Sequence, residues 1–236
     1  MALLEVKDIN VGYGNVQVLW DINLNIDEGK IIALLGANGA GKTTLLNTMT
    51  GMMRPMSGEV LFKGERIDNL PSDKIIEKGI AYLPEGGRLF PDMTIKENLE
   101  MGAYPRKLWG KRKPDLERMY KLFPILEERK KQFSRTMSGG ERQMLAMGRA
   151  LMSNPTLCFF DELSYGLSPV MAKAVLDIVK KLKDDGMTIF LVEQNVNLTL
   201  DIADYAYVIE NGRIVLQGEG HELLNDDYIK KAYLGI

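Results

Sequence analysis

The segment with the clearest chemistry in this sequence is a run of glycines that ends in a lysine and two threonines. Residues 36–44 read Gly-Ala-Asn-Gly-Ala-Gly-Lys-Thr-Thr and match the pattern GxxxxGK[ST] in full. Phosphate oxygens carry clustered negative charge. A site for them needs backbone N–H groups at close range, which glycine permits, and a helix N-terminus aimed at the anion. An apolar run precedes the segment and a helix-compatible stretch follows it, which is the context that this motif requires. We therefore predict a phosphate-binding loop.

The parts of this loop have separate expected roles. Lys42 is expected over the β- and γ-phosphates of a nucleotide, and Thr43 is expected to offer its hydroxyl to Mg²⁺. A glycine-rich turn without a ligand is the alternative, but such a turn does not need the complete motif. The predicted nucleotide contacts in the loop are Gly36, Ala37, Asn38, Gly39, Ala40, Gly41, Lys42, Thr43 and Thr44.

Two neighbouring carboxylates form the second chemical element. Asp161 and Glu162 directly follow the apolar run from Leu157 to Phe160. Asp161 is predicted to help hold a Mg²⁺ ion, and Glu162 to act as the general base on an attacking water. Two acids after an apolar run are commonly just a solvated strand end. Downstream of a phosphate-binding loop, they indicate a Mg²⁺-nucleotide site.

A second glycine-containing helix start forms the third element. Ser138, Gly139, Gly140 and Glu141 precede a helical pattern of apolar residues that reaches Leu151. A serine and two glycines at a helix N-terminus can bind an anion, although they can also serve only as a helix cap. One nucleotide in one chain does not need two such helix starts.

Composition limits the class of protein. The chain has 236 residues, of which 45% are hydrophobic and 26% charged, values typical of a folded soluble protein. Its formal net charge of −2 argues against a nucleic-acid partner. One cysteine, Cys158, and one histidine, His221, exclude an intramolecular disulfide and any cysteine- or histidine-rich metal site. No signal sequence and no membrane-spanning stretch are expected.

The elements that must position these residues follow two patterns. Near the N-terminus, Leu3–Val11, Val16–Ile26 and Glu59–Ile67 predict an antiparallel sheet, and Trp20 and Ile22 are expected on the same buried face. In contrast, Ile31–Leu35 and Thr188–Val192 are short, continuously apolar runs, as is the run before Asp161. Such runs are typical of parallel strands buried on both faces.

Helices are expected between and after these strands. Ser168 and Pro169 predict an N-cap and first turn, and the helix that they begin is expected to end at Gly186. Asn211-Gly212 predicts a hairpin. Residues 87–152 predict a mainly helical insertion, in which Lys107–Lys113 is a basic loop. The predicted fold class is therefore α/β. It combines a phosphate-loop core on a mainly parallel sheet, an N-terminal antiparallel subdomain and a helical subdomain within a single domain, 1–236.

Taken in order, these motifs resemble the nucleotide-binding subunits of ATP-binding-cassette transporters, and the resemblance covers essentially the whole chain. It implies ATP and Mg²⁺ as cofactors and ATP hydrolysis as the activity. It also implies a paired site in which Ser138 and its neighbours contact the γ-phosphate held by another subunit. Two other functions are possible for such a chain: an ATP-driven module in a process other than transport, and a binding module that uses ATP only to dimerise. Both remain alternatives.

Three further roles come from the resemblance alone. Tyr13 matches the aromatic residue that stacks on adenine in this family. Glu85 stands where the family has a glutamine that contacts Mg²⁺. Gln194 stands where most relatives have a catalytic histidine, and it is expected to donate a hydrogen bond to the γ-phosphate.

The segments around Glu85 and Gln194 are similar to the smaller ATPase subunit of branched-chain amino acid importers. This implies two transmembrane permease subunits, a paralogous ATPase or a second copy as partner, and an external substrate-binding protein. It also implies a cytoplasmic location on the inner face of the membrane. No residue of the sequence is expected to touch the amino acid.

Overall fold

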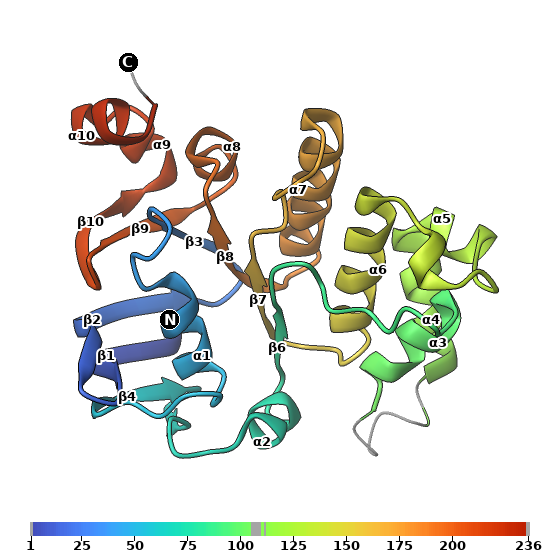
Figure 1. Ribbon diagram of the computed structural model, residues 1–236, viewed down its shortest axis with the longest axis horizontal. Coiled ribbons are helices and arrows are strands. Elements are labelled where there is room, and N and C mark those ends of the chain that lie inside the picture. The colour runs from blue at the N-terminus through green and yellow to red at the C-terminus, as the bar shows by residue number, and fades with distance from the viewer. Residues whose placement is uncertain (1, 105–109, 111, 235–236) are drawn as a thin grey trace.

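The N-terminal part of the chain forms an antiparallel sheet (Figure 1). The structure is a computed structural model that describes residues 2–104, 110 and 112–234. The strands of this sheet are β1 (Ala2–Tyr13), β2 (Val16–Asp27), β4 (Ser57–Phe62) and β5 (Glu65–Arg66), in the order β2-β1-β4-β5. The expected antiparallel sheet is therefore confirmed.

One detail of this sheet differs from the expected alternation. Ile22 is fully buried as predicted, but Leu19 is buried where Trp20 was expected, and Trp20 is only half-buried. The register between β1 and β2 shifts between the pairs Ile9–Ile22 and Val11–Leu19. At this bulge Asp21 adopts a left-handed φ of 49°. A bulge moves the following side chains to the other face, which is why the alternation fails there.

The second sheet carries the buried strands. Its order is β10-β9-β3-β8-β7-β6. All pairs are parallel except that between β9 and β10. The strands are β3 (Ile31–Leu35), β6 (Ile80–Leu83), β7 (Leu157–Asp161), β8 (Thr188–Glu193), β9 (Tyr205–Glu210) and β10 (Arg213–Glu219). Every residue of β3, β7 and β8 is buried, as their continuous apolar character predicts. The hairpin at Asn211-Gly212 joins β9 to β10, also as predicted.

The register of this sheet brings the candidate residues together at the carboxyl ends of its parallel strands. Leu35 pairs with Glu193, and Asp161 pairs with Val192. The segments that follow β3, β7 and β8 therefore leave the sheet side by side. In open parallel sheets, ligands bind outside these carboxyl ends.

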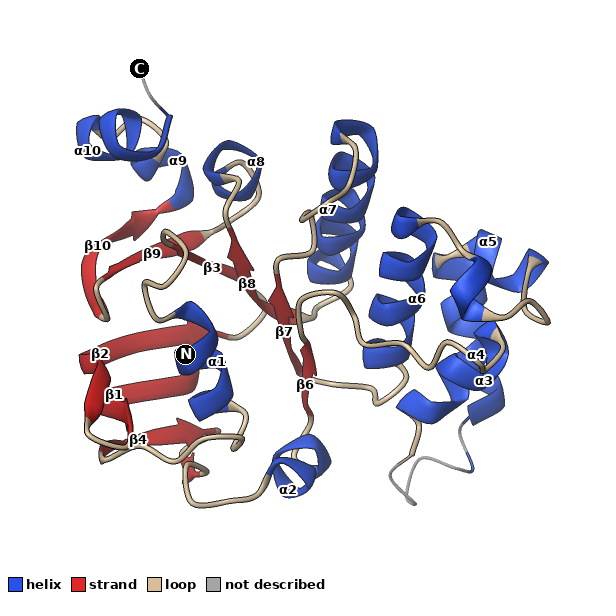
Figure 2. Cartoon of the chain, viewed as in Figure 1, coloured by secondary structure: helices blue, strands red, loops and turns tan. Residues whose placement is uncertain are grey.

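Helices α3 to α6 form a separate group at one end of the molecule (Figure 2). They come between β6 and β7 in the sequence. Helix α7 lies between α6 and the second sheet. The helices are α1 (Lys42–Met49), α2 (Ser72–Glu77), α3 (Ile95–Gly102), α4 (Arg112–Leu122), α5 (Pro124–Glu128), α6 (Gly139–Leu151), α7 (Pro169–Asp184), α8 (Val196–Leu200), α9 (Gly220–Leu223) and α10 (Asp227–Ile229). A short π-helical segment, Lys230–Leu234, follows α10.

The ends of α7 match the sequence prediction. Ser168 caps the helix by accepting a hydrogen bond from Met171 N, and Pro169 occupies the first turn. The helix ends at Asp184, two residues before Gly186, which has a left-handed φ of 91°. Most of the predicted basic loop Lys107–Lys113 lies outside the described residues. Among the helices that are described, none combines the length and apolar character needed to span a bilayer.

Candidate functional site

A cleft of about 460 Å³ lies at the carboxyl ends of the parallel strands. It brings together residues that are far apart in the sequence, from the loop after β3, the end of β6, the end of β7 and the end of β8. The predicted residues Asn38, Gly39, Gly41–Thr44, Glu85, Glu162 and Gln194 are among those that line it. The lining residues are Val18, Asn38, Gly39, Gly41, Lys42, Thr43, Thr44, Glu85, Glu162, Tyr165 and Gln194.

The loop between β3 and α1 needs its glycines for two physical reasons. Gly39 and Gly41 have φ values of 80° and 111°, in the left-handed region that favours glycine. A Cβ atom on Gly36 would instead collide with the carbonyl oxygen of Ile209. Gly41 is also the N-cap of α1, and no side chain caps this helix. The first N–H groups of α1 therefore point toward the loop without a capping side chain, as an anion site requires.

Lys42 is folded back over this loop. Its side chain is almost fully buried, and Nζ donates to Gly36 O at 2.8 Å and to Ala37 O at 3.1 Å. Burial lowers the pKa of Lys42, and the nearby carboxylates, Glu162 first among them, oppose this shift. Nζ lies 3.9 Å from Glu162 Oε1. The ammonium group is thus held where it can contact a phosphate bound by the loop.

Asp161 ends β7 and is only 4% exposed. Tyr82 donates its hydroxyl to Asp161 Oδ2 at 3.1 Å. The pKa of Asp161 is raised to about 6, first of all by burial and also by the neighbouring Glu162 and Glu85, against the lowering effect of the bond from Tyr82 and the charge of Lys42. A buried carboxylate beside other carboxylates is stabilised in its ionised form by a bound cation.

The donor set around Asp161 fits Mg²⁺. Mg²⁺ prefers hard oxygen ligands and commonly keeps several waters, with one or two ligands from the protein. The Thr43 hydroxyl and the Asp161 carboxylate provide oxygens of this kind, and Thr43 lines the cleft. Glu85 also lines the cleft and is an exposed carboxylate whose charge acts on both Asp161 and Lys42.

Glu162 lies next to Asp161 and takes an unusual backbone conformation. Its φ is 52°, in the left-handed region that non-glycine residues seldom adopt. Its N–H donates to Val192 O at 2.8 Å, and its Oε1 accepts from Gln194 Nε2 at 2.8 Å. The candidate general base is therefore fixed at both its backbone and its side chain.

Gln194 bridges two parts of the cleft. Besides Glu162, its Nε2 donates to Asn38 Oδ1 at 2.9 Å. An amide nitrogen carries two protons, and here both are used within the chain. A hydrogen bond from Gln194 to a phosphate therefore requires that one of these two bonds be exchanged.

Tyr13 lies at the hairpin end of β1, beside the loop rather than in the cleft lining. Its hydroxyl is 3.4 Å from Thr44 Oγ1, and 54% of the residue is exposed. An exposed ring beside a phosphate loop can stack on a flat base.

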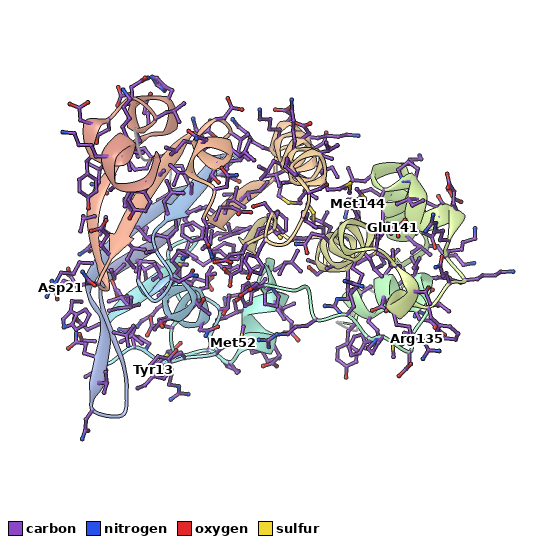
Figure 3. The ribbon with its side chains drawn as sticks, turned by 45° about the horizontal axis from the view of Figure 1, so that its top comes forward. Tyr13, Asp21, Met52, Arg135, Glu141 and Met144 are labelled. Atoms are coloured by element: carbon purple, nitrogen blue, oxygen red, sulfur yellow. The ribbon has the colours of Figure 1, made fainter. Side chains whose placement is uncertain are left out.

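Ser138 and its neighbours are not part of this cleft. In Figure 3, Tyr13 and Glu141 appear at opposite sides of the molecule. Ser138 and Glu141 form a capping box: Ser138 N donates to Glu141 Oε2 at 2.9 Å, and Glu141 N donates to Ser138 Oγ at 3.4 Å. Glu141 also pairs with Arg129 at 2.9 Å. The hydrogen bond from Ser138 N, first of all, lowers the pKa of the Glu141 carboxyl group, and the charge of Arg129 lowers it as well. Gly139 and Gly140 begin α6.

Some contributors were not identified from the sequence. Val18 and Tyr165 line the cleft, Tyr82 donates a hydrogen bond to Asp161, and the buried Glu193 accepts hydrogen bonds from Ser164. Tyr165 follows the carboxylate pair so closely that its position in the sequence could have indicated it. Tyr82 and Val18 could not have been found in this way, since their contacts depend on the pairing of distant strands.

Comparison with known proteins agrees with this geometry. The family model described as "ABC transporter" matches residues 19–164. The high-affinity branched-chain amino acid transport ATP-binding protein BraG of Pseudomonas aeruginosa is 45% identical over 99% of this chain and 100% of its own. The lipopolysaccharide export system ATP-binding protein LptB of Haemophilus influenzae is 31% identical over 100% of this chain and 98% of its own.

A solved structure gives the same result for the fold. The crystal structure of a nucleotide-free ATP-binding cassette from an ABC transporter has a TM-score of 0.86 and 27% identity, with 100% of both chains covered. The fold as a whole thus has a known counterpart. The chain belongs to the ABC transporter family and is one of its ATP-binding, ATP-hydrolysing cassettes.

Proposed function

We propose that this ATPase energises the uptake of branched-chain amino acids through partner membrane subunits. The observation that carries the proposal is the full-length similarity to BraG, at 45% identity. The lipopolysaccharide export protein LptB covers the same length at only 31% identity, which makes an export function the second candidate.

Within the cleft, we assign each residue a role from its contacts. The N–H groups at the start of α1 and the Lys42 ammonium bind the phosphates, and Tyr13 stacks on the base. Thr43 and Asp161 would hold Mg²⁺, with Glu85 close by, and the ion would supply charge neutralisation on the phosphate oxygens. Glu162 accepts the proton of the attacking water. Gln194 orients Glu162 through the 2.8 Å hydrogen bond between them.

Ser138, Gly139, Gly140 and Glu141 are assigned to the site of a second cassette. Two features support this assignment. They lie away from the cleft of their own chain, and Ser138 and Gly139 are exposed. The second cassette is either a paralogous ATPase or another copy of this chain. ATP binding would close such a pair and hydrolysis would reopen it.

A groove beside the helical segment suits the membrane subunits. It has a volume of about 900 Å³ and lies between the α2–β6 region and the helices α3 and α6. Its apolar lining includes Phe90 and Met101, which are 41% and 37% exposed, and the guanidinium groups of Arg88 and Arg149 add polar contacts. An amphipathic helix of a permease subunit would bury this apolar surface and keep the cassette on the inner face of the membrane.

Transport in the native host tests the proposal. In a strain that lacks other routes for branched-chain amino acids, Glu162→Gln should abolish the uptake of labelled leucine, isoleucine and valine but not that of an unrelated amino acid. A tagged wild-type chain should co-purify with two polytopic membrane proteins. Normal uptake of all three amino acids, together with a defect in lipopolysaccharide export, would favour the second candidate instead.

A further inference from the structure

The end of β8 contacts the segment after β7 through consecutive residues. Val192 O accepts the N–H of Glu162 at 2.8 Å, and Gln194 Nε2 donates to Glu162 Oε1 at 2.8 Å. Glu193 lies between them, and its side chain points to a different residue of the same segment, Ser164. Val192, Glu193 and Gln194 therefore hold residues 162–164 at three points.

Glu193 is almost completely enclosed, with 1% of its surface exposed. Its Oε1 accepts the backbone N–H of Ser164 at 2.9 Å, and its Oε2 accepts the hydroxyl proton of Ser164 at 2.6 Å. Burial raises the pKa of Glu193, and these two bonds oppose the shift. A buried carboxylate is costly unless it is hydrogen-bonded, and here each of its two oxygens accepts a hydrogen bond from Ser164.

The position of Ser164 links this contact to the catalytic geometry. Ser164 follows Glu162 by two residues, and Glu162 has the left-handed φ of 52°. Such a conformation persists only where the surrounding contacts determine it. Val192 O fixes the backbone on the N-terminal side of Glu162, whereas Glu193 fixes it on the C-terminal side. Without the second contact, the backbone of Glu162 is free to relax toward an ordinary conformation.

We infer that Glu193 is a positioning residue for ATP hydrolysis, because it fixes Ser164 and thereby holds the Glu162 carboxylate in the cleft. The inference rests on the proposed role of Glu162 as general base. It also gives a role to a buried carboxyl group that does not itself line the cleft.

The first test separates hydrolysis from nucleotide binding. In Glu193→Ala, kcat should fall by about 10- to 100-fold, since a small displacement of a reacting group has effects of this size. KM for ATP should change by less than about threefold, because Lys42 and the loop are untouched. Glu193→Gln should restore most of kcat, since the amide oxygen can accept from Ser164 N and the amide nitrogen can donate to the serine hydroxyl.

A matched control addresses the loss of a buried carboxylate as such. Asp68 is also buried, at 6% exposure, and accepts a backbone N–H, that of Val60, at 2.9 Å. It lies beside the antiparallel sheet and does not line the cleft. Asp68→Ala should lower the melting temperature while leaving kcat near that of the wild type.

Ser164→Ala provides a milder variant that keeps the backbone N–H, and it decides the question if Glu193→Ala does not fold. Ser164→Ala should also lower kcat. The kcat of the double variant should be no lower than that of Glu193→Ala alone, since both changes remove the same contact.

Glu162→Gln serves as the reference. If Glu162→Gln is inactive but Glu193→Ala and Ser164→Ala keep the wild-type kcat, the inference is wrong and the proposed function stands. If Glu162→Gln turns over like the wild type, the general-base assignment fails and the inference fails with it.

Discussion

The two glycine-containing helix starts of this chain look alike in sequence but differ in structure. At α1, the N-cap is Gly41, no side chain caps the helix, and its first turn has no acidic residue. At α6, Ser138 caps the helix and Glu141 completes the capping box from within the first turn. One helix start is thus left open toward the cleft, whereas the other is already satisfied by its own chain.

Of the two helix starts, only that of α1 has the features needed to bind a phosphate without a second chain. An uncapped N-terminus with Lys42 folded over its loop can bind phosphate without any rearrangement. At the start of α6, Glu141 already accepts the backbone N–H of Ser138, so the hydroxyl proton of Ser138 is left to donate to an anion, and the charge of Glu141 lies beside it. The acidic residues near the two helix starts also differ. Glu141, at α6, forms an ion pair with Arg129, whereas Asp161, in the cleft beside α1, is buried next to other carboxylates. We therefore expect α1 to bind nucleotide by itself and α6 to act only within a pair.

The largest expected effect concerns the chemistry on the α1 side. Glu162→Gln should lower the rate of ATP hydrolysis by about 10²- to 10⁴-fold, the usual effect of removing a positioned general base. ATP affinity should be retained, because Lys42 and the loop remain. Steady-state phosphate release and equilibrium binding of ATP measure the two quantities. Undiminished turnover would mean that the proton acceptor is elsewhere.

Lys42→Ala and Ser138→Ala compare the two helix starts directly. Lys42→Ala should weaken ATP binding by a single chain about 10- to 100-fold, because hydrogen bonds to charged groups contribute about 1.5–3 kcal/mol. Ser138→Ala should leave this single-chain affinity unchanged and lower only the turnover of the pair. Both affinities are measured by titration at a dilution where the chain is monomeric. A loss of single-chain affinity in Ser138→Ala would break the comparison.

Asp161→Asn tests the unbalanced charge on the α1 side. The folded-state pKa of Asp161, about 6, lies above its ordinary value of 3.8, so the folded protein binds this proton more tightly than the unfolded chain does. The ionised form therefore destabilises the fold, fully above pH 6 and less and less as the pH falls toward 3.8.

At pH 8 and without nucleotide, Asp161→Asn should raise the free energy of unfolding by about 1–2 kcal/mol. This is less than the full pKa shift implies, because the amide is also buried. Urea denaturation at pH 8 and pH 5 measures the gain, which should be smaller at pH 5. The same variant should lose hydrolysis that depends on Mg²⁺. An equal gain at both pH values would show that the carboxylate charge is not its source.

The smallest effect is expected at the capped helix start. Glu141→Gln keeps the capping box, since glutamine also serves at this position, but removes a negative charge from the place where a phosphate is expected. KM for ATP in the pair should fall about two- to fivefold, as the usual 0.3–1 kcal/mol for a charge at a helix N-terminus implies. Arg129→Gln should shift KM in the opposite direction, and a shift of the same sign in both variants would contradict this account.

Much of this arrangement could be predicted from the sequence because it depends on local chemistry. The phosphate loop has a complete motif, and the continuous apolar runs of β3, β7 and β8 identify strands buried on both faces. The capping residues Ser138 and Ser168 also lie at the predicted helix starts.

Features that depend on contacts between distant segments were not predictable. Leu19 replaces Trp20 in the core because a bulge at Asp21 shifts the register. The hydrogen bond from Tyr82 to Asp161 depends on the pairing of β6 with β7. The hydrogen bonds from the two protons of Gln194 to Asn38 and Glu162 join segments that lie far apart in the sequence. None of these contacts has a signature in the spacing of residues.

The most direct test of the central claim mixes two inactive variants. Lys42→Ala has a damaged loop at α1 but an intact α6, and Ser138→Arg has an intact loop but a blocked helix start at α6. Two tagged copies of the chain, one carrying each change, are combined and assayed for ATP hydrolysis, with each variant alone as the control. If α1 of one chain and α6 of another form the site, the mixture should regain a substantial part of the wild-type rate, since one mixed site is intact. A rate no higher than the sum of the separate variants would contradict the shared site.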